Sequence, residues 1–160
     1  MKIVGMVIQE EDLARIHQVL SRFLGESGAA EALLIDRSGQ LLAMDGVSRA
    51  LDTVSISALA AAAYSSTSAM AQLLGETEFT VLFHEGLKQS IHVSTVDDDA
   101  ILMAIFDERT TVGMVRLFAK DAAKSVGVVL AETRARPKRV GEFATPLSAD
   151  EARPHWEPPR

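Results

Sequence analysis

The sequence predicts an α/β domain of the α+β kind, with a five-stranded antiparallel sheet and helices on both faces. Apolar residues recur at helical spacing in three segments, and five shorter apolar segments have the length of strands. Short connections between the shorter segments favour antiparallel pairing. Two strands, at Leu33–Ile35 and Ile101–Phe106, are apolar at successive positions, so both faces of the sheet should be covered. The expected order is helix, strand, strand, helix, strand, strand, strand, helix.

The first three elements follow from local signals. A helix is expected over residues 10–28, because acidic side chains favour its start and apolar residues then recur every three or four positions. Two strands, Ala32–Ile35 and Leu41–Met44, should pair as a hairpin. Between them, Asp36–Gly39 has the composition of a tight turn.

The segment from Thr53 to Gly75 predicts a second helix, and it contains no charged side chain. Asp52 can cap its start, and Gly75 can end it. Helical spacing predicts that the buried stripe is Ile56, Leu59, Ala63, Ser66, Met70 and Leu73. The opposite stripe is small and uncharged: Ser57, Ala61, Ser65, Ser68 and Gln72. Surface helices normally present charge to water, so we expect this second stripe to dock another chain.

Three strands and a third helix complete the domain. The strands are expected at Phe79–His84, Leu87–Val96 and Ala100–Phe106. The first of them alternates partly with polar residues, as an edge strand does. Beyond Thr110 the spacing is helical again, with Val115, Phe118, Ala122, Val126 and Val129 inward and Arg116, Lys120, Lys124 and Glu132 facing water.

Proline content predicts where the domain ends. All five prolines lie from Pro137 onward. We therefore expect a packed domain over residues 1–136 and a disordered tail over residues 137–160. The tail contains the only tryptophan, Trp156, which is either a binding anchor or an idle residue.

Bulk composition limits the partners and the compartment. The net charge of -6 argues against nucleic acid, so proteins or small molecules are the expected partners. The chain has no cysteine, which excludes disulfides and thiolate chemistry and suits a cytoplasmic location. The hydroxyl and amide side chains of the second helix argue against a membrane span. No export signal is visible at the start of the chain.

Catalytic signatures are missing from the sequence. There is no phosphate-binding loop, no nucleophile elbow and no zinc motif, so we expect neither a cofactor nor an active site, and the chain should not be an enzyme. His84 and His92 could converge across a hairpin, although two hydrogen-bonded strand histidines are favoured over a metal pair. The acidic run Asp97–Asp99 is read as a solvated turn.

Arginines are candidates for a role in phosphoryl transfer, because an arginine inserted into the site of a GTPase can neutralise charge on the transferring phosphoryl group. The candidates, by residue type alone, are Arg37, Arg49, Arg109 and Arg116. A structural role is favoured for each of them.

Several strings suggest a family. They are Leu33–Gly39, Asp52-Thr53, Leu73–Glu76 with Phe79, Phe83–Gly86 and Ile105–Arg116. With the element order, they make residues 10–135 resemble the roadblock/dynein light chain family, and most closely its bacterial MglB-type members.

This resemblance implies a homodimer that meets through the second helix and an edge strand. It also implies that the dimer binds a Ras-like, MglA-type small GTPase and stimulates GTP hydrolysis by positioning the GTPase's own catalytic loops, in cell polarity, motility or signalling. The partner-binding residues carried over are Ala61, Ala62, Ser65 and Ser68. Where MglB-type proteins often have Ala-Gly-Asn, this chain has Ala61-Ala62-Ala63 followed by Tyr64.

Two other functions stay open. One is a dimeric structural adaptor of the dynein light chain kind, without GTPase-activating activity. The other is a small-molecule sensor or enzyme on a similar scaffold, which would need a pocket with convergent polar groups.

Overall fold

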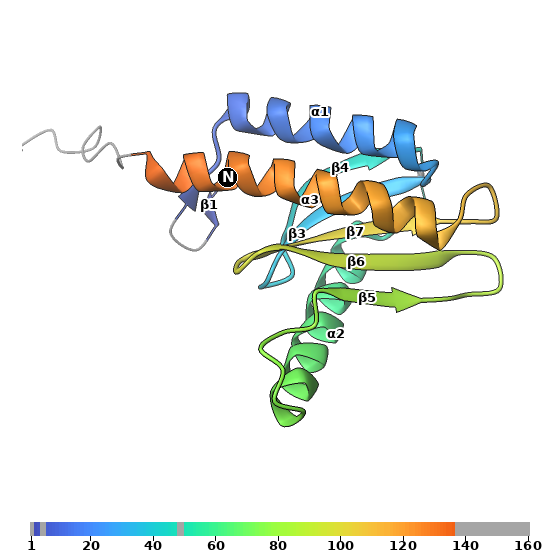
Figure 1. Ribbon diagram of the computed structural model, residues 1–160. Coiled ribbons are helices and arrows are strands. Elements are labelled where there is room, and N and C mark those ends of the chain that lie inside the picture. The colour runs from blue at the N-terminus through green and yellow to red at the C-terminus, as the bar shows by residue number, and fades with distance from the viewer. Residues whose placement is uncertain (1, 4–5, 48–49, 137–160) are drawn as a thin grey trace, which may run out of the picture.

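The computed structural model describes residues 2–3, 6–47 and 50–136. Helices α1 and α3 cover one face of a five-stranded sheet, and α2 crosses the other (Figure 1). The helices are α1 (Glu10–Ser27), α2 (Thr53–Leu73) and α3 (Val112–Ala135). The sheet strands are β3 (Glu31–Asp36), β4 (Leu41–Gly46), β5 (Val81–His84), β6 (Ser90–Asp97) and β7 (Ala100–Phe106). The predicted fold class and element order are confirmed, and a short hairpin of β1 (Lys2–Ile3) and β2 (Met6–Val7) precedes them.

All pairing in the sheet is antiparallel, in the order β4-β3-β7-β6-β5. Every residue of the central strands β3 and β7 is buried, as their continuous apolar sequences predict. Strand β5 lies at one edge, which confirms the expected edge strand, and its outer backbone groups are therefore available for pairing.

The layer of α1 and α3 holds the larger core. Nineteen buried residues pack there, from the two helices, from the sheet strands and from the segments that flank α1. The five inward residues predicted for α3 are buried or half-buried, and its predicted outer charges are exposed. This core is sufficient to hold both helices on the sheet without another chain.

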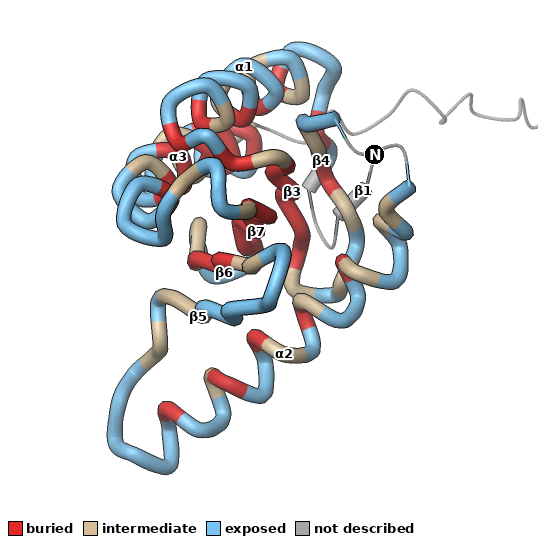
Figure 2. The backbone as a smooth tube through the Cα atoms, turned by 90° about the vertical axis from the view of Figure 1, so that its right-hand side faces the viewer, coloured by how far each residue is buried: buried red, intermediate tan, exposed pale blue. Residues whose placement is uncertain are grey.

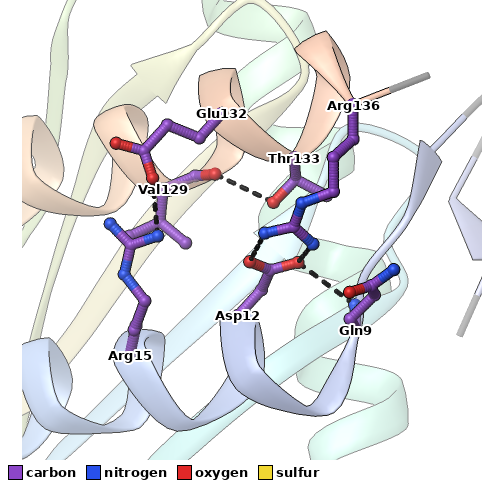
Figure 3. A network of polar contacts seen from close by, with 7 residues as sticks. All are labelled: Gln9, Asp12, Arg15, Val129, Glu132, Thr133 and Arg136. Carbon is purple, nitrogen blue, oxygen red and sulfur yellow. Dashed lines mark hydrogen bonds and ion pairs between the residues drawn. The ribbon is translucent and has the colours of Figure 1, made fainter.

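A polar network also joins α1 to α3 (Figure 3). Asp12 is fully buried and receives two hydrogen bonds of 2.8 Å from the Arg136 guanidinium. Burial by itself would raise the pKa of Asp12, but the hydrogen bonds from Arg136 and from the Gln9 backbone N–H outweigh burial and lower that pKa. A second, exposed pair joins Arg15 to Glu132 at 2.6 Å.

Local signals define the ends of α2. The Asp52 carboxylate accepts a hydrogen bond of 3.0 Å from the Ser55 backbone N–H, which confirms the expected N-cap. After the helix, Gly75 adopts a φ of 78°, in the left-handed region that glycine enters at little cost. Within the described ranges, no helix combines the length and the apolar composition that a membrane span needs.

Candidate protein-interaction surface on helix α2

The sheet-facing side of α2 differs from the prediction. Its buried residues are Ser57, Ala61, Tyr64, Thr67 and Ala71. The expectation that the stripe from Ile56 to Leu73 would be buried is therefore wrong, because most of that stripe is open to water in this chain. The sequence misled because large apolar side chains normally mark the buried face, whereas here Tyr64 is the only large side chain among the fully buried residues of α2, with Ile56 partly buried beside the same cluster.

One flank of α2 carries large apolar side chains in water. Leu59 is 69% exposed, Met70 is 53% exposed and Leu73 is 88% exposed. Ile56 and Ala63, at the same helical angle, are half-buried. We call these five residues the apolar flank. Contiguous apolar side chains of this kind mark an association surface.

The other exposed side of α2 is lined by small, uncharged residues. Ala62 and Ser65 are exposed there, together with Ala58 and Ala69. We call these four residues the small-residue ridge. Of the four carried-over partner-binding residues, Ala62 and Ser65 therefore lie at the surface, Ala61 is buried against the sheet and Ser68 is half-buried. A flat surface without charge lets another protein approach the helix backbone closely.

The C-terminal half of α2 extends beyond the edge strand β5 (Figures 1 and 2). Along this half, exposed positions outnumber buried ones, and the buried positions recur only once per turn. The loop that follows the helix returns beside it, and the Glu76 backbone N–H donates a hydrogen bond of 2.9 Å to the Ala71 carbonyl. The projecting half is thus supported mainly by its own return loop.

A polar cluster under the middle of α2 holds the helix to the sheet. The Tyr64 hydroxyl donates to the Glu78 carboxylate, and it lies 2.6 Å from the Thr95 hydroxyl and 3.1 Å from the Phe79 carbonyl oxygen. The Thr95 hydroxyl also donates to Glu78 at 3.0 Å. The Arg37 guanidinium lies 5.1 Å from the centre of the Tyr64 ring and 3.4 Å from Glu78.

The pKa values of this cluster follow from its geometry. Burial raises the pKa of the Tyr64 phenol, and the Glu78 carboxylate raises it further. The hydrogen bond from Tyr64 lowers the pKa of Glu78, and Thr95 and Arg37 act in the same direction. Tyr64 is therefore the neutral donor and Glu78 the charged acceptor.

This cluster was not predicted from the sequence. The usable signal was Tyr64 itself, as the only aromatic residue in this helix. Its partners could not be found in the same way, because Arg37, Glu78 and Thr95 come from three separate parts of the chain.

The candidate arginines are distributed over different surfaces. Arg37 belongs to the cluster under α2, and Arg109 is paired with Asp107 at 2.9 Å. Arg116 is exposed on α3, which covers the opposite face of the sheet from α2. Arg49 lies outside the described residues, as does Trp156. The ion pairs of Arg37 and Arg109 fit the structural role that the sequence favours for them.

The two strand histidines point to opposite faces. His84 pairs with Ile91 and the neighbouring Phe83 pairs with His92, and successive residues of a strand alternate between faces. They therefore do not converge. His92 is buried on the α3 side, and neither of its ring nitrogens has a hydrogen-bond partner among the described residues.

Two other features could in principle serve as sites. In the acidic turn, Asp97 and Asp99 are both paired with Arg134, at 2.8 and 3.3 Å, and the described residues contain no group of side chains suited to hold a metal.

A hollow of about 830 Å³ lies between the β5–β6 hairpin and the start of α3. The charged residues that line it are Glu85, Lys88, Asp107, Glu108 and Arg109, and Arg109 is paired with Asp107. This lining mixes both signs of charge and indicates no particular class of small molecule.

Comparisons with known proteins identify relatives of this chain. The model of the Roadblock/LC7 domain matches residues 15–106. MglB from Myxococcus xanthus is 33% identical, with a TM-score of 0.73 over 78% of this chain and 99% of that one. The gliding protein MglB from Thermus thermophilus is 30% identical, with a TM-score of 0.77 over 82% of this chain and 99% of that one.

A further structure, described as MglB with tetrameric arrangement, is 31% identical, with a TM-score of 0.78 over 82% of this chain and 99% of that one. No curated protein matched the sequence.

Proposed function

Because this chain belongs to the Roadblock/LC7 domain family, we propose that it is a homodimeric regulator that binds a Ras-like, MglA-type small GTPase and stimulates its GTP hydrolysis. The observation that carries this proposal is the exposed surface of α2. That surface has an apolar flank and a small-residue ridge, and it carries no charge. Likeness to MglB structures supports the class of partner.

The apolar flank is the part of α2 suited to self-association. Leu59, Met70 and Leu73 expose large apolar areas that a second copy of the same flank could cover. The open edge of β5 lies on the same side of the molecule, since α2 passes beyond it (Figure 2). A two-fold dimer could thus pair helices and edge strands together.

The small-residue ridge is the part suited to the GTPase. Ala62 and Ser65 offer a surface without long side chains, so switch loops of a GTPase could lie against the helix backbone. Ala61 and Ser68 border this ridge from below, and in our proposal they shape it by packing against the sheet.

Stimulation would come from positioning. Arg37 and Arg109 are held in ion pairs, and Arg116 lies on the face opposite to the ridge. The described residues around α2 therefore offer no free arginine to the nucleotide. Holding the GTPase's own catalytic loops in a reactive arrangement is the remaining contribution, and such preorganisation is a large part of phosphoryl-transfer catalysis.

Ser65→Arg and Ala62→Arg test the ridge. Each places a long charged side chain at an exposed position, so the affinity for the MglA-type GTPase of the same organism, loaded with a non-hydrolysable GTP analogue, should fall by about 100-fold or more. The measurement is a binding titration, followed by single-turnover GTP hydrolysis with this protein in excess.

Ala14→Arg on α1 is the matched control, because it adds the same charge at an exposed alanine on the other face. Unchanged affinity in Ser65→Arg and Ala62→Arg would exclude the ridge. Binding that does not depend on the nucleotide would favour the adaptor function.

A further inference from the structure

We propose that Tyr64, held by Glu78, Thr95 and Arg37, is a positioning residue that fixes the rotation and tilt of α2 on the sheet and so presents the small-residue ridge to the GTPase. We call these four residues the α2 latch. The inference rests on the proposed function for its second half, the presentation to a GTPase. Its first half, the fixing of α2, concerns this chain alone.

Tyr64 is the largest side chain that α2 buries against the sheet, and Ile56 and Ala60 add partly buried contacts near the start of the helix. The other buried residues on its sheet-facing side are Ser57, Ala61, Thr67 and Ala71, which have small side chains. Small side chains bury little apolar area each, so they contribute little to fixing the helix on the sheet. Of the seven buried residues in the apolar cluster beneath α2, only Tyr64 comes from the helix.

The Tyr64 side chain is fixed in three directions. Its hydroxyl contacts Glu78 and the Phe79 carbonyl in the loop after α2, and Thr95 in β6. Its ring is covered by Arg37, which follows β3. Contacts with three separate segments define both the rotation of the helix and its inclination.

The latch is directly connected to the ridge through the helix backbone. Ser65 immediately follows Tyr64, and Ala62 lies two residues before it, so any rotation of Tyr64 about the helix axis turns the ridge by the same angle. Because the C-terminal half of α2 projects past β5, a small tilt at Tyr64 grows into a larger displacement along that half (Figure 1).

The latch is also one electrostatic unit. Glu78 accepts from Tyr64 and Thr95 and is paired with Arg37, so the carboxylate joins all the other members. Removing either the phenol hydroxyl or the carboxylate charge should therefore release the same constraint, and the two changes should not add.

Tyr64→Phe and Glu78→Gln test the latch, since the first keeps the buried ring and the second keeps the side-chain shape. The chain has no cysteine, so Gln72→Cys on α2 and Lys120→Cys on α3 can carry a pair of spin labels, with unlabelled protein in excess to isolate distances within one copy. We expect a narrow distance distribution in the parent protein and a broader one in both variants. Affinity for the GTPase bound to a GTP analogue should fall by about tenfold, because misplacement of a positioned surface weakens binding.

Ser66→Ala is the matched control, because the Ser66 hydroxyl bonds only to the Ala62 carbonyl within the same helix among the described residues. It should change neither the distances nor the affinity. All measurements are made well below the unfolding temperature. If the latch only stabilised the fold, its variants would therefore lose stability without a change in the distance distribution or in the affinity for the GTPase. The double variant combines Tyr64→Phe with Glu78→Gln. Its affinity for the GTPase should be no lower than that of whichever single variant binds the GTPase more weakly.

The outcomes separate the two proposals. An unchanged distance distribution in Tyr64→Phe and Glu78→Gln would overturn the latch. Broader distances with unchanged affinity would overturn its role in presenting the ridge. A parent protein that binds no GTPase but shows the broadening in its variants would overturn the proposed function and leave α2 positioning supported.

Discussion

The face of the sheet under α1 and α3 is closed within one chain, whereas the face under α2 leaves large apolar side chains in water. Nineteen buried residues form the cluster on the first face, and seven form the cluster on the second. Leu59 and Leu73 belong to the second face and remain mostly exposed. Both helical layers lie on the same sheet, so the difference in buried residues between the two faces comes from the helices that cover them (Figure 2).

Two helices cover the first face and one covers the second, and side-chain size adds to this difference. Helix α1 sends Ile16, Leu20 and Phe23 into the core, and each fills a large volume against the strands. Helix α2 sends mainly Ala, Ser and Thr toward the sheet and keeps its leucines on a flank. One face is therefore closed by large side chains of its own chain, and we propose that the other is completed by another chain.

The largest expected effect concerns the closed face. Replacing Arg136 by Met removes the partner of a fully buried carboxylate, so the midpoint of denaturant unfolding should fall clearly. Arg15→Met is the matched change in the exposed pair with Glu132, and it should lower the midpoint much less. Denaturant unfolding of both variants measures the difference. Equal losses would show that Asp12 does not depend on Arg136.

A smaller effect is expected on the open face, and it concerns association. Leu59→Glu places charge in the apolar flank, so the dissociation constant of the proposed dimer should rise at least about 100-fold, or about 2.8 kcal/mol, while each chain stays folded. Analytical ultracentrifugation measures the change.

Val128→Glu is the control for this experiment, because Val128 is also an exposed apolar residue but lies on α3. It should leave association unchanged. If Val128→Glu dissociated the dimer and Leu59→Glu did not, the roles assigned to the two faces would be reversed.

The fold could be predicted from the sequence because its signals are local. The continuous apolar runs at β3 and β7 required cover on both faces, and the spacing in α3 identified its inward residues. Asp52 and Gly75 likewise marked the ends of α2 through their own backbone chemistry.

The orientation of α2 could not be predicted in the same way. Periodicity identifies an apolar stripe, but it does not say whether that stripe faces its own sheet or a second chain. In α2 the stripe that contains Leu59 and Met70 is turned away from the sheet, and the weaker stripe around Tyr64 is buried. The contacts that decide this come from Arg37, Glu78 and Thr95, which are distant from Tyr64 in sequence.

The smallest expected effect returns to the closed face and to His92, a polar residue buried in it without a hydrogen-bond partner among the described residues. Burial lowers the pKa of His92 from its usual 6.5, and the positive charge of Arg116 on α3 lowers it further. The unfolded chain therefore takes up a proton at His92 near pH 6.5, where the folded chain does not. Stability should be complete above this pH and should decrease as the pH falls below it, by at most about 1.4 kcal/mol per pH unit.

His92→Leu removes this proton uptake, so its stability should change less than that of the parent protein between about pH 7.5 and 5.5. Denaturant unfolding at several pH values measures both slopes. Equal slopes in the parent and in His92→Leu would mean that the closed face accommodates a charged imidazole. Because α2 and its flank lie on the opposite side of the sheet from His92, the Leu59→Glu change should leave the His92 slope intact, which separates the two faces experimentally.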